Sequence, residues 1–494
     1  MTAASAIHTD FLARLRRVGR HGLGLSVDVY SPDVGGLLEG LHEQGLHPEY
    51  LEVFRATSPA LRAVRHAMAT SPVTYHGEGL WLTQPGATED ALFTQEVIEV
   101  ASHLQILQSA WMNHECATKH IAGYTVGTYL PPLYTESSAA IVAENAWYVQ
   151  SLLDRHCPLG KGGSPLVLLE LPPLTYFVAG TIPIPTFFRL VSEQTSCGVV
   201  LDVGHLWTVY RYSGAWRTAT LRQFVDEFLA EFPLDRVIEI HVAGLAVHES
   251  GGQTALQSAT CGDAALPLWT DGHGAPIPSV LYEMLDQILS DRRLTHLRGL
   301  ALEVDTKPVA MIVEEFRRFY RRYEHCMAAP EDQSGQLTVS HVGERDPVPQ
   351  ATRDVVIAAY RRYAGVISGS AEPAGPEWTS RTACDEHLDL YRQVYLPYEI
   401  LQWGGELGTM FPETCRRLAE CAIPLSSFLP FWFREPRPLS AAYDFFLLKI
   451  DGFLQFVHEE APQYDALARR EAEDLREAYR FASVPVIRAP IGSQ

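Results

Sequence analysis

The hydrophobic residues of this chain fall into short continuous runs that alternate with longer amphipathic stretches, from about Gly22 to about Tyr323. Continuous aliphatic and β-branched runs are typical of parallel strands that are buried on both faces. Eight such runs predict strands at Gly22–Val29, Tyr50–Phe54, Val73–Gly77, Ile106–His114, Leu166–Glu170, Gly198–Asp202, Val237–Val242 and Leu297–Val304.

The stretches between these runs carry apolar residues at every third or fourth position, which predicts helices. They cover Asp90–Leu104, Ser137–Arg155, Pro185–Gln194, Leu221–Glu231, Ser279–Asp291 and Pro308–Tyr323. Parallel strands need crossover helices, so eight strand-then-helix units indicate an α/β protein with a (β/α)8 TIM barrel. A doubly wound sheet is the alternative, but it usually carries a glycine-rich phosphate loop, and the chain has neither GxGxxG nor GxxxxGK(S/T).

The pattern changes after residue 326. Residues 327–350 are rich in Pro, Gly, Ser, Gln and acidic residues without periodicity, which predicts a linker between a barrel domain at 1–326 and a second domain at 351–494. In the second domain strand-like runs are missing, and we expect a mainly α-helical fold. The helical stretches are Val355–Val366, Cys384–Leu401, Ala441–Val457 and Ala466–Phe481, and the aromatic tract Phe428–Phe433 should pack in a core or an interface.

Many of the predicted strands end on a histidine or a carboxylate, and the carboxyl ends of barrel strands meet at one mouth. An unpaired carboxylate at a buried strand end is costly, and basic partners are scarce there, with Lys307 the nearest candidate. We therefore expect a metal site at the mouth. The candidate ligands from strand ends and nearby loops are His76, His114, Glu170, Asp202, His205, His241, Asp271, His273 and Glu303.

Imidazole and carboxylate donors without clustered thiolates favour Fe, Mn, Zn or Co over structural zinc or an Fe–S cluster. The candidates are too many for one ion, so two or three ions that share a bridging carboxylate fit better. Glu115 follows His114 directly, and neighbouring residues of a strand point to opposite faces, so only one of the two should be a ligand. Glu239 shares the strand face of His241, and Asp305 could orient a ligand.

The composition narrows the class of protein further. The formal net charge of −20 argues against a nucleic-acid partner, which calls for a basic face. The eight cysteines have no ligand-like spacing, so we expect reduced thiols. The first twenty residues lack the apolar segment of a signal peptide, and no run is long enough to span a bilayer. We expect a soluble cytoplasmic protein without a membrane partner.

Several motifs together resemble the multinuclear non-haem iron-dependent oxidative enzymes, the family of the methanobactin-biosynthesis oxidase. The resemblance covers most of the first domain. The segments that carry it are Gly22–Leu25, Leu51–Val53, Leu130–Glu136, Cys197–Val203, Glu239–Gly244 and Asp271–Pro278.

This resemblance implies an oxidoreductase that contains two or three Fe ions in mixed Fe(II)/Fe(III) states and uses O2 as co-substrate. It implies iron ligands at His76, Glu170, Asp202, His241, Asp271, His273 and Glu303. Glu170 would be the bridging carboxylate, and Glu170, His241 and Asp271 would be the catalytic residues. The substrate would be a ribosomally synthesised precursor peptide in natural-product biosynthesis, oxidised at a cysteine.

The chain departs from the family pattern at four places. The usual Glu-His pair reads His114-Glu115, with His114 taken as the ligand, and Glu-Asn reads Glu170-Leu171. An asparagine ligand is lost where Asp202–His205 replaces Asp-Val-Asn-Asn, which makes His205 the candidate replacement. The Ala-Gly-His end reads Ala243–Leu245.

The second domain, from Tyr391 to Phe456, resembles the family's separate peptide-recognising partner protein, here fused in the same chain. An unrelated helical appendage is the alternative. Two other functions stay open for the whole chain. One is a sugar-isomerase-like or hydrolytic enzyme that uses a divalent metal without O2, and the other is a non-catalytic peptide- or metal-binding protein.

Overall fold

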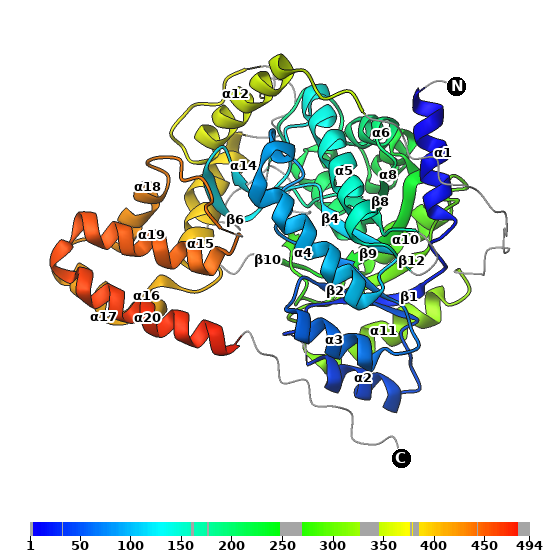
Figure 1. Cartoon of the computed structure of the whole chain (residues 1–494), viewed down its shortest axis with the longest axis horizontal. Helices are drawn as coiled ribbons and strands as arrows, with labels where there is room; N and C mark the ends of the chain where they lie inside the picture. The colour runs from blue at the N-terminus through cyan, green and yellow to red at the C-terminus, as the bar shows by residue number, and fades with distance from the viewer. Residues whose placement is uncertain are drawn as a thin grey trace.

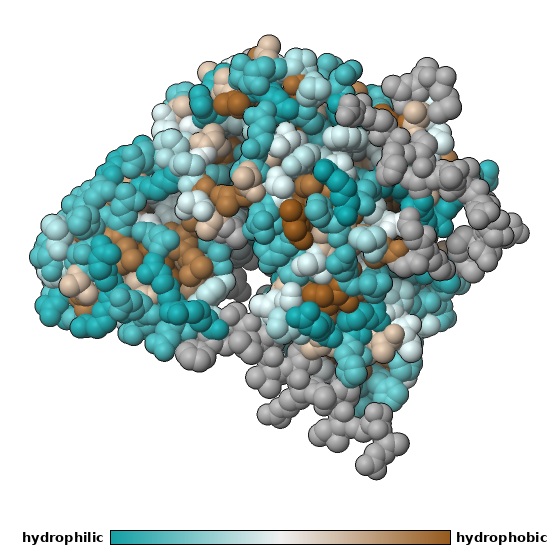
Figure 2. Space-filling view, viewed as in Figure 1, coloured by the Kyte–Doolittle hydropathy of each residue, from teal (hydrophilic) through white to brown (hydrophobic). Residues whose placement is uncertain are grey.

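The computed structural model describes residues 3–31, 33–159, 163–174, 177–247, 269–326, 345–375, 378, 385–441 and 443–482. Figure 1 shows a barrel surrounded by helices, with the C-terminal helices α14–α20 gathered at one side of it. The space-filling view is mainly hydrophilic over both parts, with small separate hydrophobic areas (Figure 2). None of the described helices combines the length and the apolar character needed to cross a membrane.

The predicted barrel is confirmed. Eight strands pair in parallel and close in the order β1-β12-β9-β8-β7-β4-β3-β2. They are β1 (Gly22–Val27), β2 (Tyr50–Phe54), β3 (Val73–His76), β4 (Trp111–Glu115), β7 (Leu166–Glu170), β8 (Gly198–Asp202), β9 (Val237–Ala243) and β12 (Gly299–Glu303). Their continuous hydrophobic runs match the double burial of a parallel barrel.

Helices cover the outside of the barrel, as the amphipathic stretches predict. They are α2 (Val34–Glu43), α3 (Ser58–Ala67), α4 (Ala91–Leu107), α5 (Glu136–His156), α6 (Ile184–Gln194), α7 (Val203–Tyr212), α8 (Leu221–Glu231), α10 (Ser279–Leu289) and α11 (Val309–Tyr323).

Two predicted strands are wrong at both ends. Leu297–Val304 is shortened to Gly299–Glu303, and Ile106–His114 is displaced along the chain. Ile106 belongs to the last turn of α4, which ends where Gln108 adopts a left-handed conformation with φ 56°. The strand itself then starts at Trp111 and continues through Glu115. An apolar run thus joins the end of a helix to the start of a strand, and periodicity alone cannot separate them.

Inward-facing residues at alternate strand positions fill the amino-terminal part of the barrel. They include Tyr50, Trp111, Leu168 and Ala301, all buried. Helix α1 (Ala3–Leu15) packs Phe11 and Leu15 against this inner cluster. The amino-terminal end is therefore closed by apolar packing, which leaves polar inward positions only toward the carboxyl ends of the strands.

Two antiparallel hairpins extend the carboxyl end of the barrel. One pairs β5 (Thr118–Ile121) with β6 (Tyr124–Leu130), between β4 and α5. The other pairs β10 (Leu245–Val247) with β11 (Trp269–Asp271), after β9. The eight-run pattern does not predict either hairpin, because both are short and only partly buried.

The C-terminal region is mainly helical, as predicted. Its helices are α12 (Gln350–Ile367), α14 (Asp385–Leu390), a π-helical turn (Tyr391–Tyr395), α15 (Leu396–Leu401), α16 (Leu407–Met410), α17 (Pro412–Glu420), α18 (Phe428–Trp432), α19 (Phe445–Glu460) and α20 (Asp465–Ala482). Residues 327–344 of the predicted linker lie outside the described residues. From Arg345 onward the chain contacts the barrel, since the Arg345 guanidinium donates to the carbonyl of Gln194 at 3.1 Å. The division into two domains stays a prediction.

Strand β6 forms much of the contact between the two parts. The indole of Trp432 donates to the carbonyl of Thr125 at 2.7 Å, and the hydroxyl of Thr128 donates to Glu399 at 2.6 Å. The aromatic tract is buried here, with Phe428 at 0% and Trp432 at 7% exposure, which confirms the predicted packing. The C-terminal helices therefore sit against a hairpin that belongs to the carboxyl end of the barrel.

Candidate metal centre

The inward positions at the carboxyl ends of the strands carry the predicted donors. Side chains alternate between the two faces of a strand, so the series that begins with the apolar inner cluster reaches a polar residue at the strand end. The donors placed in this way are His76 on β3, Glu170 on β7, Asp202 on β8, His241 on β9 and Glu303 on β12. None is more than 1% exposed.

Four of these donors form one compact group. Single ligand atoms of Glu170, Asp202, His241 and Glu303 all lie within 4.8 Å of one another. The Nδ1 atom of His241 is 3.4 Å from Oε1 of Glu170 and 3.7 Å from Oε2 of Glu303. Donors that surround one ion at about 2 Å each have comparable separations. This central group has the composition and the spacing of a metal site.

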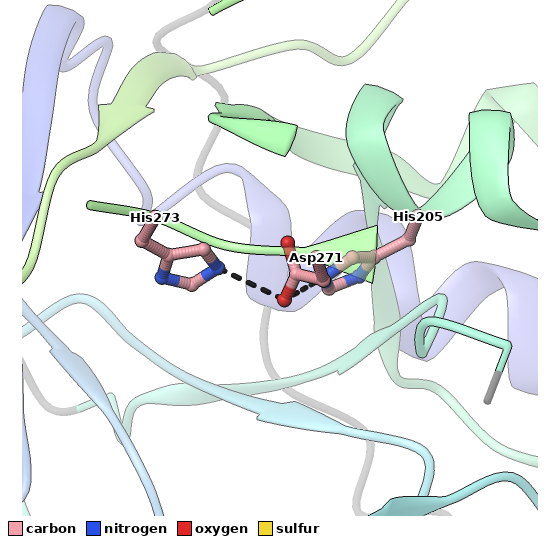
Figure 3. Close-up of side chains that lie close together, drawn as sticks. All are labelled: His205, Asp271 and His273. Atoms are coloured by element: carbon pink, nitrogen blue, oxygen red, sulfur yellow. Dashed lines mark hydrogen bonds and ion pairs between the residues drawn. The ribbon is translucent and has the colours of Figure 1, made fainter. Parts of the chain in front are cut away.

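A second group lies at the rim of the mouth and consists of His205, Asp271 and His273 (Figure 3). Oδ2 of Asp271 is 3.4 Å from Nε2 of His205 and 3.1 Å from Nε2 of His273. Asp271 ends β11, and His205 lies in the first turn of α7. The hairpin and a helix start thus bring together residues that are 66 positions apart.

Hydrogen bonds orient both imidazoles of the rim group. Nδ1 of His205 is 2.6 Å from the carbonyl of Leu171, and because a carbonyl only accepts, Nδ1 carries the proton. Nδ1 of His273 bonds the carboxylate of Asp305. In both rings Nε2 is the atom that faces Asp271 and can bind a metal. Asp305 thus has the orienting position that the sequence suggests, and His205 occupies the place where an asparagine ligand is missing.

His114 is not brought to the mouth. It lies on the outer face of β4, where Nε2 accepts the Leu80 N–H at 3.1 Å and Nδ1 is 2.7 Å from the carbonyl of Glu115. Both ring nitrogens are therefore engaged with backbone, and we correct the expectation that His114 is a ligand. The alternation of β4 sends Glu115 inward instead, with Oε2 3.7 Å from Nε2 of His76.

A third group lies deeper in the barrel, below His241. Nε2 of His241 is 3.2 Å from Oε1 of Glu52 and 3.6 Å from Oε2 of Glu239. Tyr50 donates to Glu239 at 2.6 Å, and Ser26 donates to Glu52 at 3.1 Å. Glu52 is not among the predicted donors, although the inward alternation that starts at Tyr50 points to it.

Glu170 contacts three imidazoles from three different elements. Its Oε2 atom is 3.4 Å from Nε2 of His76, and its Oε1 atom is 3.4 Å from His241 and 3.6 Å from His205. The two oxygens of one carboxylate thus face different donors. This is the arrangement that a carboxylate bridging two ions requires.

The carboxylates clustered at the mouth outnumber the histidines that face them. Within the described part of the chain, every ion pair that these carboxylates form has a histidine as partner. The seven carboxylates are those of Glu52, Glu115, Glu170, Asp202, Glu239, Asp271 and Glu303. Burial raises the pKa of Glu303 to about 8 and that of Glu115 and Glu239 to about 7. Burial also works against charge on His76, but Glu115, Glu170 and Glu52 raise its pKa to about 10.

The buried donor atoms fit metal ions. Several have no hydrogen-bond partner among the described residues: Glu115 Oε2, Glu170 Oε1, Asp202 Oδ2, both nitrogens of His76 and of His241, Asp271 Oδ1 and Glu303 Oε2. Buried polar atoms are normally paired, and unpaired ones cost free energy. Divalent cations with carboxylate and imidazole ligands would satisfy these atoms together.

These observations define a TIM-barrel protein with a candidate multinuclear metal centre at the carboxyl ends of its strands. The chain belongs to a family of enzymes described as "RiPP precursor modification enzyme MbnB/TglH/ChrH", whose sequence model matches residues 20–322. The resemblance stated from the motifs is thereby confirmed for the barrel. The C-terminal region lies outside this match.

The individual relatives share less than a third of their aligned residues with this chain. The chain is 24% identical over 315 residues to a UPF0276 protein of an Anaeromyxobacter species, covering 62% of this chain and 94% of that one. It is 28% identical over 219 residues to a UPF0276 protein of Paraburkholderia phytofirmans, covering 42% of this chain and 60% of the relative. The match thus spans less than two thirds of the Paraburkholderia protein.

Among solved structures, the chain is similar to endonuclease IV from Thermus thermophilus, with 17% identity and a TM-score of 0.37 over 61% of this chain and 99% of that one. It is also similar to a xylose isomerase domain protein from Planctomyces limnophilus, with 14% identity and a TM-score of 0.37 over 62% and 97% of the two chains.

Proposed function

We propose that this protein is an iron- and O2-dependent enzyme that oxidatively modifies a ribosomally synthesised precursor peptide at a cysteine. The observation that carries the proposal is the position of Glu170, whose two oxygens face His76 on one side and His241 and His205 on the other. A carboxylate in this position suits a centre of two or three ions. Membership in a family of precursor-peptide modification enzymes supports a peptide as the substrate.

The chain's own residues would hold and isolate such a centre. Glu170, Asp202, His241 and Glu303 would hold one ion, and His205, Asp271 and His273 another. The hydrogen bond from His205 Nδ1 to the Leu171 carbonyl keeps the proton off Nε2, and the Asp305 carboxylate orients His273. Iron bound there would supply a site for a substrate thiolate and the activation of O2.

We also propose that the C-terminal region presents the peptide to the mouth. Tyr443 packs on Trp81, with ring centroids 5.0 Å apart, and Trp81 lies in the segment that follows β3. Lys119 lies over the rings of Tyr129 and Trp403, at 4.1 and 5.2 Å.

Tyr129 in turn donates to Glu78 at 3.1 Å, and Glu78 follows the candidate ligand His76 by two residues. A chain of contacts thus leads from the C-terminal helices to the metal centre. Trp403, 40% exposed, offers a ring to a bound peptide next to this chain.

The test of the chemistry uses the full-length protein purified without oxygen. Elemental analysis and Mössbauer spectroscopy would identify the metals, and mass spectrometry would follow a cysteine-containing precursor peptide encoded beside the gene. We expect coupled iron ions and a mass change that requires O2. Zinc without iron, or peptide turnover that proceeds without O2, would contradict the proposal and favour a divalent-metal isomerase or hydrolase.

The test of peptide delivery compares Trp403→Ala with Val355→Ala, an exposed control on α12. An aromatic residue that contacts the peptide should contribute about 1.4 kcal/mol, so Trp403→Ala should raise the KM for the peptide about tenfold and leave the iron content unchanged. Val355→Ala should change neither. An unaltered KM in Trp403→Ala would reject this role of Trp403.

A further inference from the structure

Strand β4 presents a carboxylate to the mouth where the sequence suggested an imidazole. Residues Trp111 and Asn113 share one face of the strand with Glu115, and Trp111 belongs to the inner cluster of the barrel. In the parallel pairing of β4 with β7, Glu115 lies directly opposite Glu170. Two adjacent strands therefore end on inward carboxylates at the same level of the barrel.

The Glu115 carboxylate has the environment of a metal ligand, because it is buried and one of its oxygens has no hydrogen-bond partner. Its side chain is 10% exposed, and its Oε2 atom is buried without a hydrogen-bond partner. The nearest titratable atom in its ion pairs is Nε2 of His76, at 3.7 Å, and that same nitrogen is 3.4 Å from Oε2 of Glu170. Both nitrogens of His76 are likewise buried without a hydrogen-bond partner.

We propose that His76, Glu115 and Glu170 form a metal site of one imidazole and two carboxylates, in which Glu115 is the donor from β4. The site depends on the metal centre of the proposed function but not on its O2 chemistry. His114 cannot take this role because its ring lies on the outer face and both nitrogens are bonded to backbone groups. Glu170 then contributes one oxygen to this site and the other to the central group.

The exchange of an imidazole for a carboxylate changes the site's chemistry. Carboxylate is a harder ligand and carries a full negative charge, so the site favours Mn and the higher oxidation state of iron over softer ions. Asn113, which donates to Oε2 of Glu170, lies on the same strand face and limits the rotation of that carboxylate. The Glu170 carboxylate on β7 is therefore held in place by a hydrogen bond, whereas no hydrogen bond holds Oε2 of Glu115.

The decisive experiment compares Glu115→Gln with His114→Gln in the full-length protein. Metal-free protein would be titrated anaerobically with Mn(II), and free Mn(II) would be followed by EPR. We expect Glu115→Gln to lose one equivalent, or to bind it about 100-fold more weakly, since even the loss of an orienting partner can weaken binding to that extent. His114→Gln should keep every equivalent. Full binding by Glu115→Gln, or an equal loss in both variants, overturns the assignment.

A second variant keeps the test decisive if Glu115→Gln does not fold. Glu115→His replaces one donor by another, and in protein labelled with ¹⁵N-histidine it should add one nitrogen coupling to the pulsed EPR spectrum of bound Mn(II). The absence of a new coupling overturns the assignment. A wild-type protein that binds no Mn(II) at all would instead contradict the proposed function itself, so the two failures are distinguishable.

Discussion

The donors at the mouth come from two kinds of structure. Glu170, His241 and Glu303 lie on strands in the middle of a closed sheet, and their side chains are 0 to 2% exposed. Asp271 and His273 lie on a short hairpin strand and in the loop that follows it, and their side chains are 22% and 17% exposed. The strand donors are held by backbone ladders on both sides, whereas the rim donors are held mainly by one another.

The strand donors therefore form the rigid part of the centre, and the rim donors form its adaptable part. The positions of the strand donors follow from the barrel and cost little to organise. The rim donors depend on contacts such as that between His273 and Asp305, which weaken when any member is removed. We therefore expect the strand half to determine whether metal is bound at all, and the rim half to determine how many ions are bound.

The largest effect should come from the residue that joins the two halves. Glu170→Ala removes the carboxylate that contacts His76, His241 and His205, so more than one metal equivalent should be lost. Elemental analysis of anaerobically purified protein would measure this loss. Glu324→Ala, an exposed change on the same barrel, is the control. Retention of the full metal content would refute a bridging role for Glu170.

A smaller loss should follow from a change in the rim half. His205→Ala removes one of three donors of the rim group and leaves the central group intact. We expect the loss of one metal equivalent and no more, measured in the same way. If His205→Ala empties the centre as Glu170→Ala does, then the two halves are not separable and the comparison fails.

A smaller effect than the loss of a whole metal equivalent should follow from Glu52→Gln, a change deep in the barrel. Glu52 faces Nε2 of His241 at 3.2 Å, so its negative charge favours a proton on Nε2, which leaves Nδ1 free for metal. Gln keeps the shape and the acceptor oxygen but lacks the charge. We expect affinity for the ion at His241 to fall roughly 10- to 100-fold, measured by competition with a chelator. Glu52→Leu, which has no acceptor oxygen, should bind this ion more weakly still, and equal metal affinities for the two variants would exclude an orienting role for Glu52.

The smallest effect concerns the pH dependence of the metal-free protein. Burial raises the pKa of Glu303 to about 8, so between roughly pH 5 and 8 the folded state keeps a proton that the unfolded state has released. Stability should therefore fall as pH rises through this range. For Asp271, burial opposes the charged form, but His273 and His205 lower its pKa, so its contribution should be lost only as pH falls below about 4.

Thermal unfolding in the presence of EDTA would measure both limbs of this dependence. Glu303→Gln should remove the fall in melting temperature between roughly pH 5 and 8 and leave the loss of stability below about pH 4 unchanged. Asp271→Asn should do the reverse. A wild-type melting temperature that does not change between pH 6 and pH 9 would contradict the raised pKa of the strand carboxylate.

Much of the barrel and of its mouth could be predicted from the sequence. The strand boundaries of β2, β7 and β8 were predicted to the residue, because doubly buried strands leave continuous hydrophobic runs. The donors Glu170 and Asp202 follow from these boundaries, since the last residue of such a run must lie at the mouth. Glu303 and His241 each stand one position before the end of a predicted run, so the sequence places them near the mouth as well.

The structure differs from the sequence prediction where the local sequence has no clear signal. The run around Ile106 joins the end of a helix to a strand, and the strand end then falls at Glu115 rather than His114. A shift of one residue exchanges the two faces of a strand, which moved the imidazole outward and the carboxylate inward. The sequence predicts no donor at Glu52, because its run reads as an ordinary buried strand.

The sequence by itself determined the barrel, its helical cover, the mainly helical C-terminal region and the identity of most residues at the mouth, because burial on both faces and helical periodicity are local patterns. Only the tertiary structure decided which side chains meet. Closure of the barrel placed Glu170 among three imidazoles, the β10–β11 hairpin brought Asp271 to His205, and the alternation of β4 selected Glu115 over His114. These contacts join residues far apart in the chain, so no local pattern could specify them.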